Sequence, residues 1–244
     1  NVDTIANNLV NVNTSGFKKA RLSFVDLVTQ QPPTVRSEDL SADAASTSSR
    51  GTGVSVGQTW RSFEAGEARK TDSPYDVAIA GDGFMEVVLP DGSHAYSRGG
   101  TLRIAADGQL ATATGLPLKP GIAIPDDVTD LTISLDGRVT VRTPRQNGSV
   151  EVGQLELVRF VSPNALQALG DNIFRATEAA GEPIAGRAGE SGMGPIRQGF
   201  LEGSNVKLVE EMVNLMVAQR AYEASVKVAQ ASDEMLGMVN NLRQ

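Results

Sequence analysis

Few residues in this chain have the types and spacing that catalysis requires. His94 is the only histidine, so a Ser-His-Asp arrangement would have to be built around it. It stands beside a Pro-Asp-Gly turn in a predicted strand, and we expect it to be an ordinary strand residue. The chain contains no cysteine, which excludes thiol catalysis, disulfides and cysteine-based metal sites.

The acidic and glycine-rich motifs are equally weak as signs of chemistry. Asp126, Asp127 and Asp130 suggest a carboxylate pair for glycoside hydrolysis, but that reaction needs a cleft and a defined carboxylate separation. The Asp-Gly pairs lack the Asp-x-Asp-x-Asp-Gly spacing of a calcium loop and are typical of turns. Gly81-Asp82-Gly83 lacks the third glycine of a dinucleotide-binding motif. We therefore expect no catalytic residue, no cofactor site and no metal site.

Composition limits the classes of partner. The 244 residues are 40% hydrophobic and 21% charged, which suits one or two globular domains. The formal net charge of -7 leaves no electrostatic footprint for nucleic acid. We expect the short basic cluster Lys18, Lys19 and Arg21 to be a solvated face. No apolar run approaches the ~18 residues of a membrane span, and no secretory signal is visible. The first residue is Asn1, so we expect that the natural start has been either trimmed or left out.

The elements that would have to position any site begin with the last forty or so residues. Residues 204–244 contain no proline, and their apolar side chains recur at helical spacing. This stripe consists of Leu208, Met212, Leu215, Tyr222, Val226, Ala229 and Leu236. Ser204 is predicted to cap a helix that would span about 57 Å. We expect the stripe to pack against another long helix; the alternative is packing on the core of its own domain.

A second amphipathic stretch lies at the other end of the chain. Val2, Ile5, Leu9 and Val12 fall at helical spacing, and Gly16 is suited to a left-handed turn after the helix. The asparagines of this stretch are poor helix formers, so we expect them to make specific hydrogen bonds. Residues 30–53 are rich in Pro, Ser, Thr, Ala and Gly and are predicted to be a linker or a segment that orders only against neighbours.

The middle of the chain has the pattern of a β domain. Short strands are predicted from Asp76 to Phe160, with hairpins around Asp107-Gly108 and Asp136-Gly137. A short helix is predicted at residues 164–169, ended by Gly170. The fold class is therefore predicted to be α+β, with terminal helices paired in a coiled-coil-like layer, extended connectors and an inserted, mainly antiparallel β domain. The expected segments are an N-terminal helix and turn (1–29), a connector with short β structure (30–73), the β domain (74–176), a second connector (177–203) and the C-terminal helix (204–244).

Three ordered motifs resemble those of a known family. They are IANNLVNVNTSGFKKAR at residues 5–21, DVAIAGDGFMEVVLPDGSHAYSRGGTLRIAADGQLATATGLPL at 76–118 and GFLEGSNVKLVEEMVNLMVAQRAYEASVKVAQASDEML at 199–236. Together they resemble the axial proteins of the bacterial flagellar rod and hook, most closely those of the distal rod. The family normally carries a longer helical stretch before the first motif than this chain has.

The resemblance implies a structural subunit and no enzyme. It implies a helical homopolymer forming a drive shaft and export channel, located in the flagellar basal body and crossing the periplasm toward the outer membrane. The implied partners are proximal rod subunits, hook subunits, the peptidoglycan-layer and outer-membrane ring proteins and the flagellar type III export apparatus. The expected assembly interface consists of Ile5, Asn7, Asn8, Leu9, Leu208, Met212, Leu215, Met216, Tyr222, Val226 and Leu236. The alternatives are a proximal rod or hook subunit, or a periplasmic protein that binds or cleaves peptidoglycan.

Overall fold

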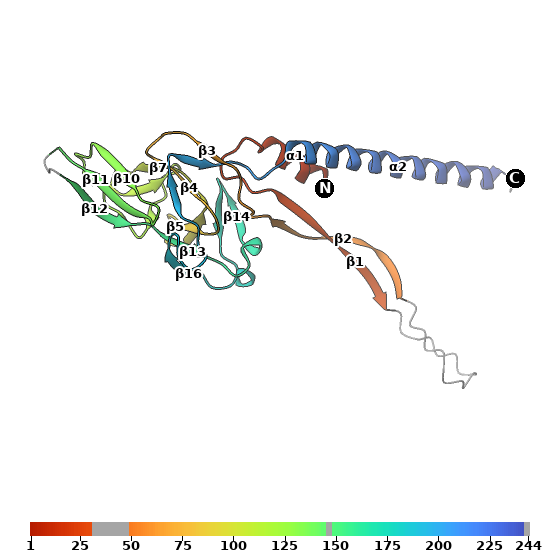
Figure 1. Cartoon of the computed structure of the whole chain (residues 1–244). Coiled ribbons are helices and arrows are strands. Elements are labelled where there is room, and N and C mark those ends of the chain that lie inside the picture. The colour runs from red at the N-terminus through yellow and green to blue at the C-terminus, as the bar shows by residue number, and fades with distance from the viewer. Residues whose placement is uncertain (31–48, 145–147, 242–244) are drawn as a thin grey trace, which may run out of the picture.

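The computed structural model describes residues 1–30, 49–144 and 148–241. The chain is mainly antiparallel β structure with one α-helix at each end, which is an α+β architecture (Figure 1). Helix α1 (Val2–Val10) and helix α2 (Leu208–Asn241) lie together at one side of the molecule. Neither of these helices is long and apolar enough to cross a membrane within the part of the chain that the structure describes.

The strands fall into five sheets. A two-stranded ribbon pairs β1 (Ala20–Gln30) with β2 (Ser49–Arg61), and a second pairs β3 (Ala68–Lys70) with β18 (Phe200–Glu202). The largest sheet has the order β14 (Gln167–Gly170), β15 (Ile173–Arg175), β6 (His94–Ser97), β5 (Phe84–Val88), β13 (Glu156–Arg159) and β16 (Ile184–Arg187), with β9 (Leu118–Lys119) also on β5. A four-stranded sheet has the order β17 (Ile196–Gln198), β4 (Asp76–Ile79), β7 (Gly99–Ile104) and β8 (Leu110–Thr112). The last sheet consists of β10 (Asp130–Ile133), β11 (Arg138–Arg142) and β12 (Ser149–Gln154).

Both predicted hairpins are confirmed. Strands β10 and β11 pair with Ile133 opposite Val139, and β7 and β8 pair with Ile104 opposite Leu110. The glycines of their Asp-Gly turns have positive φ angles, +87° at Gly137 and +76° at Gly108, which a side chain would disfavour. The buried faces of these strands join one apolar core that fills the β domain.

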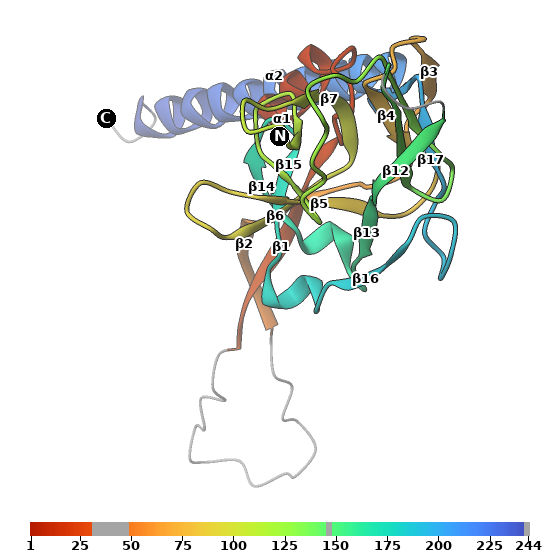
Figure 2. The same ribbon diagram turned by 90° about the vertical axis from the view of Figure 1, so that its left-hand side faces the viewer.

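A second, aromatic core lies between the β domain and the base of the β1–β2 ribbon. Phe63, which follows β2, packs edge-to-face against Phe84 and Phe174, with centroid distances of 5.2 and 4.9 Å. Tyr96 and Phe160 extend the cluster in the same geometry. Because Phe63 enters this cluster, the ribbon is fastened to the β domain at its base, while its far end projects away from the body (Figure 2).

The ribbon itself was only half predicted. The sequence indicated a strand over residues 54–63 but not its partner β1, which pairs with it from Ala20↔Arg61 onward. Strand β1 lacks the alternation of apolar and polar residues that predicts a strand with one buried face. Its consecutive apolar residues Phe24 and Val25 are both exposed, at 54% and 53%. The centre of the predicted linker, residues 31–48, lies outside the described residues.

Three local predictions are corrected. Residues 164–169 do not form an α-helix: a 3-10 turn η1 (Pro163–Ala165) leads into β14, since pairing with β15 outweighs the local helix signal. Ser204 does not cap α2, which begins at Leu208; its hydroxyl accepts a hydrogen bond from the Val206 N–H at 3.3 Å. The stretch 177–203, predicted as a connector, contains η2 (Glu178–Ala180) and the strands β16, β17 and β18.

Candidate assembly interface

Helix α1 lies against the first turns of α2 (Figure 1), and a buried asparagine fixes its position. Asn8 donates from Nδ2 to the Ala20 carbonyl and accepts at Oδ1 from the Ala20 N–H, both at 2.9 Å. Its Nδ2 also lies 3.4 Å from Glu211 Oε2 on α2. The expectation of a specific hydrogen bond is confirmed for Asn8, which ties α1 to β1 and α2 together.

The predicted interface residues separate into two groups. Ile5 and Asn8 are buried within the chain, Leu9 and Leu215 are half-buried, and Asn7 is exposed. The remaining members are exposed on α2: Leu208, Met212, Met216, Tyr222, Val226 and Leu236. Tyr222, for example, is 71% exposed. The structure therefore brings the α1 residues into contact with the start of α2 and leaves the rest of the α2 set uncovered in the single chain.

The apolar surface of α2 is wider than the predicted stripe. Further exposed apolar side chains are Val209, Val213, Val217, Val228, Met235 and Met238. At 100° per residue, Val213 and Val217 point well away from Leu208 and Met212, so apolar side chains occur around the whole circumference. Charged side chains such as Glu223 and Lys227 lie between the apolar ones, but exposed apolar surface of this extent normally marks an interaction site, and most of the helix extends beyond the β domain (Figure 1).

A buried cluster of charges joins the helices to the β domain. Glu202, at the end of β18, is 4% exposed and accepts from Lys18 Nζ at 2.7 Å and from Arg98 Nε and Nη2 at 3.2 Å. Arg98 also donates to the carbonyls of Gly83 and Gly81, at 2.7 and 2.8 Å. Lys18, fully buried, donates to the Glu64 carbonyl at 2.7 Å. We call Lys18, Arg98, Glu202 and Asn205 the junction cluster.

Asn205 completes this cluster just before α2. Its Oδ1 accepts from the Lys19 N–H at 2.8 Å, and its Nδ2 donates to the carbonyls of Ser62 and Glu64 at 2.8 and 3.2 Å. One side chain thus links the segment leading into α2 to both strands of the β1–β2 ribbon at its base. Every such bond satisfies a backbone group that would otherwise lose its partner.

The ionisation of the cluster follows from its burial. Burial lowers the pKa of Lys18, and Glu202 only partly offsets this effect. Burial by itself would raise the pKa of Glu202, but Arg98 and Lys18 together hold that pKa below its ordinary value. The buried carboxylate is therefore stabilised in its charged form by two cations.

Sequence reasoning missed this cluster. Lys18 was expected on a solvated face with Lys19 and Arg21, and this prediction is wrong for Lys18 and Lys19, which are both buried. Its partner Glu202 is 184 positions away along the chain, so no local sequence pattern predicts the pair. The one available signal was the charged residue Glu202 between two glycines, Gly199 and Gly203, directly before the long helix.

The histidine considered for catalysis has an ordinary surface environment. His94 is an exposed strand residue whose Nδ1 lies 3.0 Å from Glu86 Oε1. Within residues 1–30, 49–144 and 148–241, no group of three His, Cys, Asp or Glu side chains is placed to hold a metal ion. The features that stand out in this molecule are thus an uncovered apolar helix and a buried joint.

Comparison with known proteins gives these features a context. Residues 197–242 match the family described as flagellar basal body rod FlgEFG protein C-terminal, and residues 78–141 match the flagellar hook protein FlgE/F/G D1 domain. The flagellar basal-body rod protein FlgG of Borreliella burgdorferi is 45% identical over 100% of this chain and 93% of its own length. The chain belongs to the flagellar rod protein family. FlgG of Caulobacter vibrioides is 41% identical, covering 100% of this chain and 94% of its own length, and FlgG of Bacillus subtilis is 33% identical, covering 100% and 93%. The chain is accordingly a structural subunit of the flagellar rod.

Proposed function

We propose that this rod family member polymerises helically as a subunit of the distal rod. In this proposal α1 and α2 pair with those of neighbouring copies in a coiled-coil-like inner layer around an export channel, and the β domain lies outside. The observation that carries it is the apolar circumference of α2, which is exposed in the single chain. Burial of such a surface between copies is the main driving force for association.

The proposal extends to place and partners. We place the polymer in the basal body, crossing the periplasm and transmitting torque to the hook, without enzymatic activity of its own. Its neighbours would be proximal rod subunits, hook subunits, the peptidoglycan-layer and outer-membrane ring proteins and the export apparatus. The similarity to FlgG relatives over the full chain favours the distal rod over the proximal rod or the hook.

A charge introduced on α2 tests the proposal. We expect Leu215→Asp to abolish rod assembly and motility while the β domain stays folded, because an unpaired carboxylate would be desolvated in the interface. Gln167→Glu is the matched control, since it adds a charge at an exposed polar position of β14, in the β domain that the proposal places outside the helical layer, and should leave motility intact. Basal bodies imaged by electron microscopy and motility in the host are the measurements; normal swimming of the Leu215→Asp strain would overturn the proposal.

Deletion of the gene distinguishes whether the subunit belongs to the distal rod, the proximal rod or the hook. A short rod stub without outer rings and hook would support the distal rod. A missing rod would indicate the proximal position, and a complete rod with rings but no hook would indicate a hook subunit. Intact flagella would overturn the proposed function altogether.

A further inference from the structure

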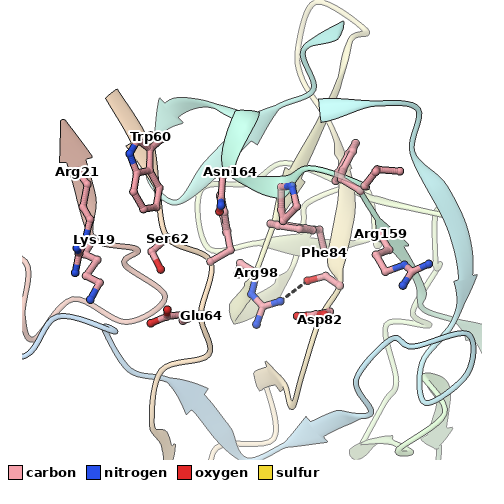
Figure 3. A pocket seen from close by; sticks show the side chains of 15 residues that line it. Lys19, Arg21, Trp60, Ser62, Glu64, Asp82, Phe84, Arg98, Arg159 and Asn164 are labelled. Atoms are coloured by element: carbon pink, nitrogen blue, oxygen red, sulfur yellow. Dashed lines mark hydrogen bonds between the residues drawn. The ribbon is translucent and has the colours of Figure 1, made fainter. Parts of the chain in front are cut away.

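A charged pocket lies where the β1–β2 ribbon leaves the β domain. This cavity of about 640 Å³ has Lys19, Arg21 and Trp60 on the ribbon side, and Asp82, Arg98 and Arg159 on the β-domain side (Figure 3). We call it the junction pocket. It is separate from the exposed apolar residues of α2, none of which lines it.

The junction pocket is positively charged in an acidic protein. Four cations line it (Lys19, Arg21, Arg98 and Arg159) against two carboxylates (Glu64 and Asp82), while the whole chain has a net charge of -7. Glu202 neutralises Arg98 from behind, but it is shared with the buried Lys18, so the ion triad keeps one positive charge. The local excess of positive charge therefore favours an anionic occupant.

The side chain of Lys19 supplies the pocket with an ammonium group that has no partner in the described part of the chain. Lys19 is only 6% exposed, yet among the described residues its ammonium group has no hydrogen bond or ion pair; its backbone N–H donates to Asn205 and its carbonyl accepts from the Ser62 N–H. No side-chain nitrogen that is fully buried lacks a partner in the described part of the chain, so the Lys19 ammonium is not fully buried, and Lys19 is one of the residues that line the cavity. An ammonium group without a protein partner that is open to a pocket can donate to a carboxylate at about 2.7–2.9 Å, the length of a charge-assisted hydrogen bond.

Two further cations are free to join it. Arg159 is exposed at the end of β13 and has no side-chain partner among the described residues. Arg21 makes only a long, exposed contact with Glu210, at 3.5 Å. An arginine fork binds a carboxylate through two parallel N–H bonds, so these side chains can hold an acidic segment that enters over Lys19.

We propose that the junction pocket binds a carboxylate-bearing segment of a neighbouring copy of this chain. This inference rests on the proposed function, because a polymer built from repeated heterologous contacts needs a second surface besides the α2 helices. A second copy supplies the required chemistry: the chain has 29 acidic against 22 basic residues. Electrostatic contacts of this kind fix orientation and register between subunits, whereas the apolar contacts of α2 supply most of the association energy.

Cross-linking identifies the contact directly. Filaments are assembled from an equal mixture of ¹⁴N- and ¹⁵N-labelled full-length chain and treated with a carbodiimide, which joins an ammonium group to a carboxylate in contact with it. Mass spectrometry should find Lys19 linked to a carboxylate of the differently labelled copy. A Lys19 that remains unlinked in filaments, or that is linked only within its own chain, would overturn the inference.

A charge reversal at the rim tests its role in assembly. Arg159→Glu should raise the critical concentration for polymerisation about tenfold, equivalent to one lost favourable contact. The matched control Arg142→Glu, an exposed arginine on β11 outside the pocket, should change it less than about twofold. Both variants are first checked for unchanged thermal unfolding, since both sites are exposed. Equal critical concentrations for the two variants would overturn the inference alone, whereas wild-type protein that forms no filaments would overturn the proposed function and the inference with it.

Discussion

Glu202 is the residue on which the joint between helices and β domain depends. It accepts hydrogen bonds from Lys18, Arg98 and the Gly66 N–H, the last at 3.0 Å, so both carboxylate oxygens are engaged. Removing one member of a buried ion group leaves the other charges without compensation, which is far more damaging than loss of a surface pair. The joint is therefore specific as well as buried: only a carboxylate at this position satisfies both cations.

Glu202→Gln is expected to lower the free energy of unfolding by about 3–5 kcal/mol. The pH dependence has a definite sign. Because the pKa of Glu202 is lower in the folded than in the unfolded chain, the unfolded chain takes up the proton first as the pH falls. The stabilisation is thus present above the ordinary value of 4.5 and is lost as the pH falls through the folded pKa. Urea unfolding from pH 7 to pH 3 should show this loss in the wild type and not in Glu202→Gln.

Glu210→Gln, at an exposed pair, should cost at most about 1 kcal/mol; equal effects of the two changes would contradict the assignment.

At the scale of elements, the sequence predicts those helices and strands that are determined by residues close together in the chain. Helix α2 and the hairpins β7–β8 and β10–β11 are set by spacing and turn residues within a few positions, and all were predicted. Strand β1 and the junction cluster depend on partners far along the chain, and both were missed. The candidate interface on α2 could be named from the sequence as a stripe, but its full circumference could not, because a stripe was expected to face a single partner.

The exposed part of α2 should be the weakest element of the free subunit. In the second half of the helix, from Tyr222 onward, the described side chains are exposed, so tertiary packing does not support it. In a dilute monomer we expect trypsin to cleave after Arg220 and Lys227 well before it cuts within the β domain. In assembled filaments these sites should be protected. Limited proteolysis followed by mass spectrometry measures both states, and a monomer whose α2 resists as long as its β domain would contradict the expectation.

At the scale of the whole molecule, α2 and the β domain are two parts that the junction cluster connects. Among the described side-chain hydrogen bonds at this joint, Asn205 binds the base of the ribbon beside both of its strands, and Glu202 binds the β domain through Arg98. If the subunit transmits torque as proposed, the angle between these two parts has to stay constant, because a compliant joint would absorb rotation instead of transmitting it. The joint of the rod family member thus consists of buried polar contacts, while the surface that we propose for assembly is apolar.

Loosening that joint should widen the distribution of angles between α2 and the β domain without unfolding either part. Asn205→Ala removes hydrogen bonds to Lys19, Ser62 and Glu64, each worth about 1 kcal/mol, but leaves the apolar core of the β domain untouched. The chain has no cysteine, so spin labels can be placed on exposed α2 and β10 positions through Val213→Cys and Thr132→Cys. Pulsed electron paramagnetic resonance should give a narrow distance distribution in the otherwise unchanged chain and a broad one with Asn205→Ala. Asn164→Ala, an exposed asparagine without side-chain hydrogen bonds among the described residues, should keep the narrow distribution. A narrow distribution with Asn205→Ala would show that the orientation of α2 is held elsewhere, and the aromatic contact of Phe63 would then be the next position to change.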